Sequence, residues 1–304
     1  MDGLLLVRKP SGPTSHDVVA RLRKILGQKK VGHFGTLDPL ASGLLVVAAG
    51  RATRFFPYYS KLDKTYEGRI RLGYATDTYD REGRPTGPEC ERLPDPNALR
   101  SAMKAFEGGI LQRPPVYSAK KLEGKPLYAY ARRQEAVEPA PVPVSVASFE
   151  LRSYDPPFLD FRVDCGSGTY IRSLAHDLGA ALGCGGHLDD LVRTRVGDFL
   201  LEAALAAEDI EVLQARNETD RFLLPLGALL PGLPRYDLTE EGGRRMKDGR
   251  TVGPGHLASG GDGQVPFPAD GAAVVRLFGP DGALLALARP APPPALFAPF
   301  LVLL

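Results

Sequence analysis

The hydrophobic pattern at the start of the chain predicts a strand, a turn and a helix. The apolar run at residues 4–7 is typical of a buried strand. Two prolines within residues 9–13 predict a rigid turn, because proline fixes φ. Thr14 and Asp17 have the spacing of a capping box, with Asp in place of the usual Glu. Apolar residues then recur at helical spacing, at Val18, Val19, Leu22, Ile25 and Leu26.

Further along, short apolar or alternating runs indicate strands, and helical spacing indicates helices. Three strands are predicted, at residues 44–49, 65–72 and 158–165. Two helices are predicted, at residues 98–106 and 170–182. Residues 75–97 are rich in Asp, Gly and Pro, which predicts a loop. Strands interspersed with helices favour a mixed α/β or α+β domain, which we place at residues 1–230.

The composition changes near residue 231, after which Gly and Pro are dense. Two strand-like runs, at residues 272–278 and 284–288, flank the turn sequence Gly-Pro-Asp-Gly at residues 279–282. The length of 304 residues also fits two domains. We therefore expect a small β-rich second domain at residues 231–304.

Composition and charge exclude disorder but say little about partners. With 43% hydrophobic and 24% charged residues, the chain has enough apolar material for a sizeable core. The net charge of +2 favours no class of partner. The first 54 residues, however, hold nine Lys and Arg against three Asp. This imbalance is of the kind that attracts phosphate, although a solvated helix face has the same pattern.

Residues 118–138 mix basic and aromatic side chains. Tyr128 and Tyr130 are interleaved with basic residues, at Lys120, Lys121, Lys125, Arg132 and Arg133. This mixture suits an RNA-contacting insertion and, equally, a solvated basic helix.

Cysteine usage and the N-terminus indicate a cytoplasmic protein. The three Cys form no Cys-x-x-Cys pattern, so neither a disulfide framework nor a zinc ribbon is expected. Asp2 stands where a signal peptide needs basic residues, and no stretch approaches the ~20 apolar residues of a membrane helix. The sequence contains neither a metal-binding His-Glu-x-x-His nor a Walker loop, and we expect no metal.

The segment 32–43 holds the main candidate for chemistry, Asp38. Three glycines in twelve residues permit unusual backbone angles, and Pro39 holds Asp38 extended. A stiff loop of this kind can present a carboxylate to a substrate. The alternative is an Asx-type turn in which Asp38 caps its own backbone, and the local sequence alone favours that turn.

The pattern Gly-His-x-Gly-Thr-Leu-Asp-Pro at the start of this segment closely resembles the catalytic loop of the TruB family of tRNA pseudouridine synthases. Four further segments resemble motifs of the same family, at residues 8–15, 63–68, 112–119 and 168–174. The matches follow the family order between residues 4 and 200. From these motifs the chain is identified as a member of the family, of the bacterial stand-alone type.

The resemblance implies two partners at the centre of the reaction. Asp38 aligns with the essential aspartate of a reaction that breaks the C1′–N1 bond of uridine, rotates the base and rejoins it through C5. A carboxylate can attack C1′, attack C6 or remove a proton from C2′, and the sequence does not choose among these routes. Arg172 matches the arginine that pairs with the aspartate and keeps it ionised.

The remaining matches are expected around the target base. Tyr66, which we count among the catalytic residues, and Tyr170 match two tyrosines at that base, where stacking on an extruded uracil is worth ~1–3 kcal/mol. His33 matches a histidine near the flipped nucleotide, and Leu191 matches an apolar wall of the base pocket. Taken singly, each would be interpreted as an ordinary core or surface residue.

The resemblance also implies a fold, a substrate and a set of partners. The family fold is a mixed α/β catalytic domain around an antiparallel sheet, followed by a small PUA-like β domain that binds RNA. The implied substrate is uridine 55 in the TψC loop of tRNA, bound through the T arm. No cofactor and no guide RNA are expected, and the protein is expected to be a monomer. Phe34 and the weakly basic segment 190–193 depart from the family pattern.

Two other functions stay open on the residues themselves. A non-catalytic RNA-binding protein would keep the scaffold and tolerate the loss of Asp38. A nucleoside or glycoside hydrolase would need a second carboxylate ~5–9.5 Å from the first. Asp77 and Asp80 are the candidates for that second carboxylate, because both lie in a loop that could approach Asp38 in space.

Overall fold

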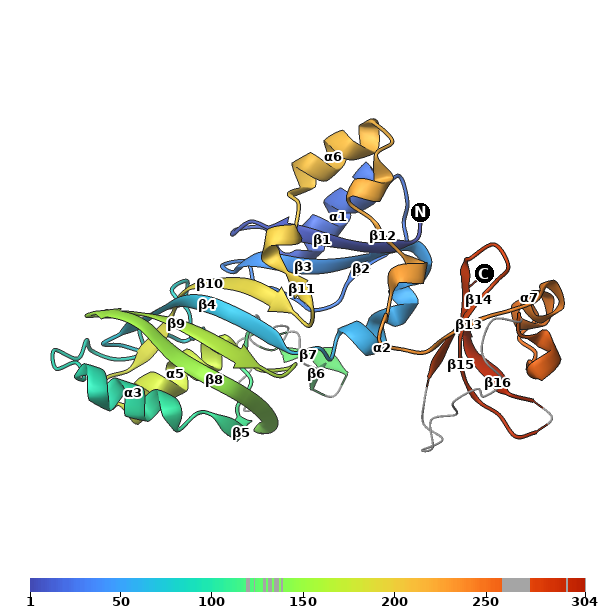
Figure 1. Ribbon diagram of the computed structural model, residues 1–304. Helices are drawn as coiled ribbons and strands as arrows, with labels where there is room; N and C mark the ends of the chain where they lie inside the picture. Colours follow the sequence, from blue (N-terminus) through green and yellow to red (C-terminus); the bar gives the residue numbers. More distant parts are fainter. Residues whose placement is uncertain are drawn as a thin grey trace.

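The computed structural model describes residues 1–118, 121–122, 124–127, 130, 133, 137, 139–258, 274–293 and 295–303. Within these residues, ten strands form one large sheet (Figure 1). Eight of them follow one another across it, in the order β12 (Leu224–Pro225), β1 (Gly3–Lys9), β3 (Ser42–Ala49), β10 (Gly186–Val196), β4 (Lys64–Leu72), β9 (Phe158–Cys165), β8 (Val142–Asp155) and β5 (Gly108–Gln112). Two short strands extend the sheet, β2 (Val31–His33) beside β3 and β11 (Phe199–Leu200) beside β10.

The direction of one central pairing differs from the expected antiparallel sheet. Strands β3 and β10 run parallel, whereas the other neighbours across this sheet are antiparallel among the residues described. The mixed α/β class is confirmed, and the sheet itself is mixed. The parallel junction joins a half built from β1 and β3 to a half built from β4, β8, β9 and β10.

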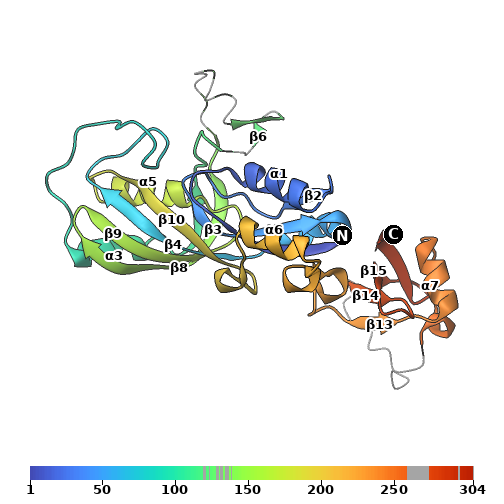
Figure 2. The ribbon, with the colours of Figure 1, turned by 90° about the horizontal axis from the view of Figure 1, so that it is seen from above.

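Four helices cover these two halves (Figures 1 and 2). Helices α1 (Ser15–Ile25) and α6 (Ala207–Ala215) pack against β1 and β3, where Leu5 and Val47 meet Leu22 of α1. Helices α3 (Pro96–Lys104) and α5 (Ile171–Ala181) pack against the other half, with Leu99, Leu174 and Phe161 in one core. The shorter elements are η1 (Gly50–Phe55), α2 (Phe56–Tyr59), β6 (Lys121–Leu122), β7 (Lys125–Pro126), η2 (Leu201–Ala203), η3 (Thr219–Arg221) and η4 (Leu226–Ala228).

The predicted start of α1 is confirmed in detail. The Thr14 hydroxyl accepts a hydrogen bond from the Asp17 backbone N–H at 3.1 Å, and Asp17 Oδ2 accepts one from the Thr14 N–H at 2.9 Å. This reciprocal capping satisfies two N–H groups that a helix start would otherwise leave unpaired. The glycine-rich loop is shorter than predicted, because Val31–His33 is β2 and β3 begins at Ser42.

A second, four-stranded sheet follows near the C-terminus. Its strands run in the order β13 (Arg235–Asp237), β14 (Val275–Phe278), β15 (Leu284–Pro290) and β16 (Phe297–Val302). Strands β14 and β15 pair antiparallel, as the turn sequence between them predicts. Helix α7 (Glu240–Lys247) and η5 (Pro254–His256) precede β14. The boundary at residues 230 and 231 stays a prediction.

The two sheets share a packed junction. Phe278 and Leu287 of the small sheet lie in one apolar cluster with Val46 of the large sheet and Phe55 of η1. Arg276, on β14, is 9% exposed, and its guanidinium donates to carbonyl oxygens of the connecting segment. Four carbonyls accept, those of Leu233 (3.1 Å), Leu229 (3.2 Å), Pro231 (3.2 Å) and Gly227 (3.4 Å). The connection is therefore fixed by hydrogen bonds as well as by apolar packing.

The expected basic insertion at residues 118–138 lies largely outside the described residues. The parts described include β6 and β7, which pair antiparallel. Three of the residues that define its basic and aromatic character, Lys120, Tyr128 and Arg132, are outside the described part. The RNA-contacting role of this segment stays a prediction.

Candidate active site

Asp38 lies in the loop that joins β2 to β3, and a buried lysine donates hydrogen bonds to carbonyl oxygens of this loop. Lys9, at the end of β1, donates from Nζ to the carbonyl oxygens of Ala41 (2.6 Å), Pro10 (2.9 Å) and Pro39 (3.4 Å). Burial lowers the pKa of Lys9 to about 8, an effect that the Asp38 carboxylate opposes and a neighbouring arginine increases. The end of β1 thereby fixes the residues on the C-terminal side of Asp38.

Two serines of the N-terminal motif fix the same loop. The Ser15 hydroxyl donates to the Leu37 carbonyl at 2.9 Å and accepts from the Leu37 N–H at 2.8 Å. The Ser11 hydroxyl donates to the carbonyl of Leu40 at 2.9 Å. The residues on both sides of Asp38 are thus bonded to the turn and helix that precede β2. These bonds place the segment 8–15 directly against the Asp38 loop.

Arg193, on β10, holds the start of the loop. Its side chain is 2% exposed and donates to the carbonyls of Leu44 (2.8 Å), Gly35 (3.0 Å) and Thr36 (3.3 Å). Gly43 makes room for this arrangement, because a Cβ there would lie 2.4 Å from the Arg193 carbonyl oxygen. The φ of Gly43 is also +106°, a conformation that favours glycine.

The Asp38 carboxylate faces Arg172 at the start of α5. Arg172 Nε lies 2.9 Å from Asp38 Oδ2, as an ion pair whose angle departs from that of an aligned hydrogen bond. The Arg172 side chain is 6% exposed, whereas that of Asp38 is 37% exposed. The carboxylate is therefore paired on one side and open on the other, and it serves the ion pair rather than an Asx turn.

A second carboxylate binds the same guanidinium. Asp80 Oδ2 lies 3.4 Å from Arg172 Nη1, and the Asp80 side chain is 8% exposed. Its other oxygen accepts from the Thr78 hydroxyl at 2.6 Å and from the Glu82 N–H at 3.1 Å. Arg172 Nη2 donates to the Tyr117 carbonyl at 2.9 Å. Arg172 is therefore held by its own partners and can orient Asp38.

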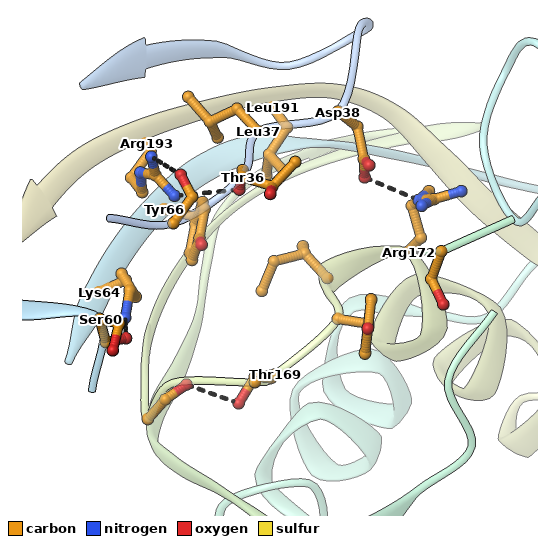
Figure 3. Close-up of a pocket in the computed structure, with 16 residues that line it drawn as sticks. Thr36, Leu37, Asp38, Ser60, Lys64, Tyr66, Thr169, Arg172, Leu191 and Arg193 are labelled. Carbon is orange, nitrogen blue, oxygen red and sulfur yellow. Dashed lines mark hydrogen bonds and ion pairs between the residues drawn. The ribbon is translucent and has the colours of Figure 1, made fainter. Parts of the chain in front are cut away.

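Asp38 and Arg172 open onto a cavity of about 240 Å³. Figure 3 shows it between the Asp38 loop, strand β4, strand β10 and the start of α5. Its lining residues are Gly35, Thr36, Leu37, Asp38, Ser60, Lys64, Tyr66, Ser118, Gly166, Gly168, Thr169, Tyr170, Ile171, Arg172, Leu191 and Arg193. The cavity thus combines a carboxylate, three cationic side chains and apolar walls.

Strand β4 contributes two buried side chains to this cavity. Tyr66 is 8% exposed, and its burial raises the pKa of the hydroxyl, an effect that Arg193 opposes. Lys64, two residues earlier on the same face, is 5% exposed and donates from Nζ to the carbonyls of Ser60 (2.9 Å) and Leu62. Burial and the nearby Arg193 together lower the pKa of Lys64 to about 8.

The sequence that forms this site is similar to known proteins. Residues 23–171 match the family model described as TruB family pseudouridylate synthase (N terminal domain), and residues 172–231 match the tRNA pseudouridylate synthase B C-terminal domain. The chain is 44% identical to the tRNA pseudouridine synthase B of Solibacter usitatus, over 82% of this chain and 85% of the relative. It is also 44% identical to that of Cupriavidus metallidurans, over 94% of this chain and 90% of the relative.

The chain belongs to the TruB family.

Solved structures give the same assignment of fold. The TruB-family chain is similar to a chain in the structure of an H/ACA RNP bound to a substrate RNA containing 2′-deoxyuridine, with a TM-score of 0.70 and 25% identity. The match covers 99% of this chain and 85% of the other. A chain in a Cbf5-Nop10-Gar1 complex matches with the same TM-score and coverage at 27% identity.

The structure brings together most of the residues predicted for the site. The same cavity is lined by Asp38, Arg172, Tyr66, Tyr170 and Leu191. Tyr170 is fixed by a reciprocal pair of bonds, because its N–H donates to the side-chain oxygen of Gln112 at 2.7 Å and its carbonyl accepts from the Gln112 amide at 2.9 Å. The long-range grouping expected from the motifs is therefore observed.

His33 is placed apart from this group. It ends β2, and its Nδ1 accepts from the Gly35 N–H at 3.4 Å. Among the described residues, it is not one that lines the cavity. Burial lowers the pKa of His33, and Arg193 lowers it further, so its neutral form predominates at pH 7. The histidine lies at the base of the Asp38 loop rather than beside the cavity.

The sequence did not predict Lys9, Lys64 or Arg193 as site residues. Lys9 and Lys64 each belong to a segment that resembles a family motif, and Lys64 has the two-residue spacing from Tyr66 that places both on one face of a strand. Asp80 was expected only as a candidate second carboxylate near Asp38, and its pairing with Arg172 was not predicted, because the two residues are 92 positions apart.

Two further properties concern the described residues only. No group of three or more His, Cys, Asp or Glu side chains is arranged there to hold a metal ion. A helix with the length and hydropathy needed to span a bilayer is likewise not found in that part of the chain.

Proposed function

We propose that the protein converts uridine 55 in the TψC loop of tRNA to pseudouridine, with Asp38 as the catalytic carboxylate. One observation carries the proposal. Asp38 is paired with Arg172 at 2.9 Å, and it opens onto a cavity that Tyr66 and Leu191 also line. A charged carboxylate beside an aromatic side chain is what attack on a uridine held in that cavity requires.

In this proposal each predicted residue acts on the flipped nucleotide. The target uridine leaves the RNA loop and enters the cavity, where Tyr66 and Tyr170 contact the base and Leu191 forms an apolar wall. Arg172 pairs with the Asp38 carboxylate and orients it. His33 supports the catalytic loop from its base and contacts the RNA backbone near the flipped nucleotide.

The choice of tRNA rests on the relatives. The chain is 41–46% identical to proteins named tRNA pseudouridine synthase B, but 25–27% identical to the chains from H/ACA assemblies. This difference favours a tRNA substrate bound through its T arm, without a guide RNA. We extend the proposal to a monomeric protein that needs no cofactor.

The small sheet at residues 231–304 is proposed to be a PUA-like RNA-binding domain. Helix α7 supports this role, because Arg244 and Lys247 are exposed on it. Exposed cations bind phosphate without reading the base sequence. This part would then contribute affinity rather than the choice of target uridine.

Hydrolysis by two carboxylates is the weaker alternative. Asp80 does approach the site, but it binds the far side of Arg172, and its second oxygen is occupied by Thr78 and Glu82. Asp77 is exposed and accepts from the Arg84 N–H at 2.8 Å. Neither is among the described residues that line the cavity, so neither is placed to act as a second acid on the substrate.

Tritium release tests the proposed reaction directly. A T-arm stem-loop labelled at C5 of the target uridine loses tritium when C5 joins C1′. We expect release by the wild-type protein without any guide RNA, and a loss of at least ~10⁴-fold for Asp38→Asn, as for removal of a central catalytic group.

The control is retained RNA binding by Asp38→Asn, measured by filter binding. Equal release by the variant would refute the role of Asp38. Absence of release by wild-type protein that binds both the stem-loop and full-length tRNA would favour a non-catalytic RNA-binding protein.

A further inference from the structure

Lys64 is a buried cation in the cavity that the proposed roles leave unused. Its ammonium donates to the carbonyls of Ser60, at 2.9 Å, and Leu62. Among the described residues, no carboxylate lies within ion-pair distance of it. An ammonium has three N–H donors, so one remains for a ligand. A charge buried without a carboxylate is costly, and a further acceptor on the unused donor would lower that cost.

The position of Lys64 relative to Asp38 is informative. Figure 3 shows Asp38 and Arg172 on one side of the cavity and Lys64 with Ser60 on the other. Tyr66 shares its face of β4 with Lys64. A planar base that contacts Tyr66 would therefore have one edge toward the carboxylate and the opposite edge toward the ammonium.

The chemistry of uracil assigns these two edges. Asp38 acts at C1′, at C2′ or at C6, and all three atoms lie at or beside the N1–C6 edge. Within the ring, C4 lies opposite N1, so the carbonyl oxygen O4 projects from the far edge. A base with its N1–C6 edge at Asp38 therefore directs O4 toward the end of the cavity that contains Lys64.

Negative charge develops on O4 whichever step comes first. When the C1′–N1 bond breaks, its electron pair goes to N1 and is delocalised over O2 and O4. When the carboxylate instead adds to C6, the pair of the C5–C6 double bond moves toward C4, and O4 becomes an enolate oxygen. In both routes a fixed donor at O4 stabilises the charge, and loss of one such donor typically costs ~10²–10³-fold in rate.

We propose that Lys64 is a further catalytic residue, which donates a hydrogen bond from its ammonium to O4 of the target uracil. The proposal rests on the proposed function. It also gives Lys64 a role in specificity, because cytosine carries an amino donor where uracil carries the O4 acceptor. The lysine makes this bond without giving up its proton.

The surroundings of Lys64 keep the donor charged but incompletely satisfied. Burial, together with Arg193 on β10, lowers the pKa of Lys64 to about 8. Cys165 on β9 and Asp63 oppose this shift. The ammonium form still predominates at neutral pH. A cation that is easily deprotonated shares its proton strongly with a developing anion.

The test compares uridine with 4-thiouridine at the target position of the T-arm stem-loop. Sulfur accepts hydrogen bonds more weakly than oxygen, so a donor at this position discriminates between the two substrates. The measured quantity is the single-turnover rate on each RNA, for wild type, Lys64→Met and Lys64→Gln. We expect Lys64→Met to lower the rate on uridine by ~10²–10³-fold. RNA affinity should change by less than about threefold, because uniform binding is not what the residue supplies.

The ratio of the two rates separates catalysis from structure. We expect the uridine to 4-thiouridine ratio to be at least ~10-fold larger for wild type than for Lys64→Met, with Lys64→Gln between them. Lys9→Met is the matched control, because Lys9 has the same lowered pKa but does not line the cavity. It should keep the wild-type ratio.

Equal ratios in wild type and either folded Lys64 variant would overturn the proposal, as would a Lys64→Met rate within threefold of wild type. If neither variant folds, a wild-type ratio near one overturns it. Lack of turnover by wild type on the uridine substrate refutes the proposed function instead.

Discussion

Two buried arginines hold two different stretches of backbone in this molecule. Arg193 donates to three carbonyls in and beside the Asp38 loop, and Arg276 donates to four carbonyls of the segment that joins the two sheets. Neither is paired with a carboxylate among the described residues. Their side chains are 2% and 9% exposed, so both charges are desolvated to a similar extent.

The surroundings of the two guanidinium groups differ. Arg193 lies among titratable groups, and it lowers the pKa values of Lys9, Lys64 and His33. Arg276 lies near Arg235 and Tyr59, and burial lowers its own pKa. The same bonding pattern therefore has two uses. At the cavity it sets the electrostatics of a site as well as the shape of a loop, whereas at the junction it sets shape alone.

Removal of Arg193 is expected to have the largest effect. Arg193→Met removes the donors to one buried and two partly buried carbonyls, and an unpaired buried carbonyl costs about 1–3 kcal/mol, so the free energy of unfolding should fall by about 3 kcal/mol. The loop that carries Asp38 loses its anchor, and a misplacement of about 1 Å costs ~10²-fold in rate. Urea denaturation and single-turnover tritium release measure the two effects. A folded variant with a rate within threefold of wild type would contradict the role assigned to Arg193.

Removal of Arg276 should separate stability from activity. Arg276→Met is expected to lower the free energy of unfolding by about 2 kcal/mol, because water can replace the lost bonds at the three carbonyls that are only partly buried. The rate on the T-arm stem-loop should stay within about threefold, since no residue of the cavity contacts this arginine. A tenfold loss in a fully folded variant would mean that the junction acts on the site.

The smallest effect is a dependence of stability on pH that comes from Lys9. The folded-state pKa is about 8 and the usual value is 10.5, so between these values the unfolded state binds more protons. Stability therefore rises with pH across this window, by at most about 1.4 kcal/mol per unit. The difference between the wild-type and Lys9→Met stability curves should grow by about 1 kcal/mol from pH 8 to pH 9.

That difference removes the contributions of other groups. Burial raises the pKa of Cys165 to about 11, which acts in the opposite direction but in both proteins alike. The charged groups that influence Lys9 are Asp38, Arg193 and Asp17. In an Arg193→Met background, the pH range over which Lys9 raises stability should narrow. Arg193 is one of the causes of the lowered pKa of Lys9, and the variant lacks it. Parallel stability curves for wild type and Lys9→Met would show that Lys9 titrates as an ordinary lysine.

The elements that the sequence predicted well are those with a local cause. Strand β9 spans the predicted residues 158–165, because its alternating pattern reflects burial on one face. Helix α1 begins at its predicted cap, because the cap and the apolar stripe are both short-range features. The direction of the β3–β10 pairing was not predictable in this way, since it depends on how distant segments meet.

The features of the candidate site also divide into those with a local cause and those that depend on distant residues. The rigid presentation of Asp38 could be derived from the glycines and Pro39 around it, but its choice of Arg172 over its own backbone could not. The pairing of Arg172 with Asp80 and the bonds from Arg193 to the loop join residues separated by 92 and about 150 positions. Only the family resemblance made such distant pairs predictable from the sequence. It did so only for pairs in which both residues lie in matched motifs.

The parallel pairing of β3 with β10 also bears on how the protein is made. Gly43 lies opposite Arg193 in that pairing, so the strand that follows the Asp38 loop can pair with β1 and β2 at once but gains its other neighbour only when β10 has been made. Roughly 150 residues must be synthesised after Asp38 before Arg193 exists, which takes about 8–30 s at 5–20 residues per second. During that interval the nascent chain carries Asp38 on a loop that Lys9 and Ser15 can hold but that lacks its bonds to Arg193. The cavity is therefore complete only when the chain has been made as far as residue 193, while the strands of the small sheet are still to come.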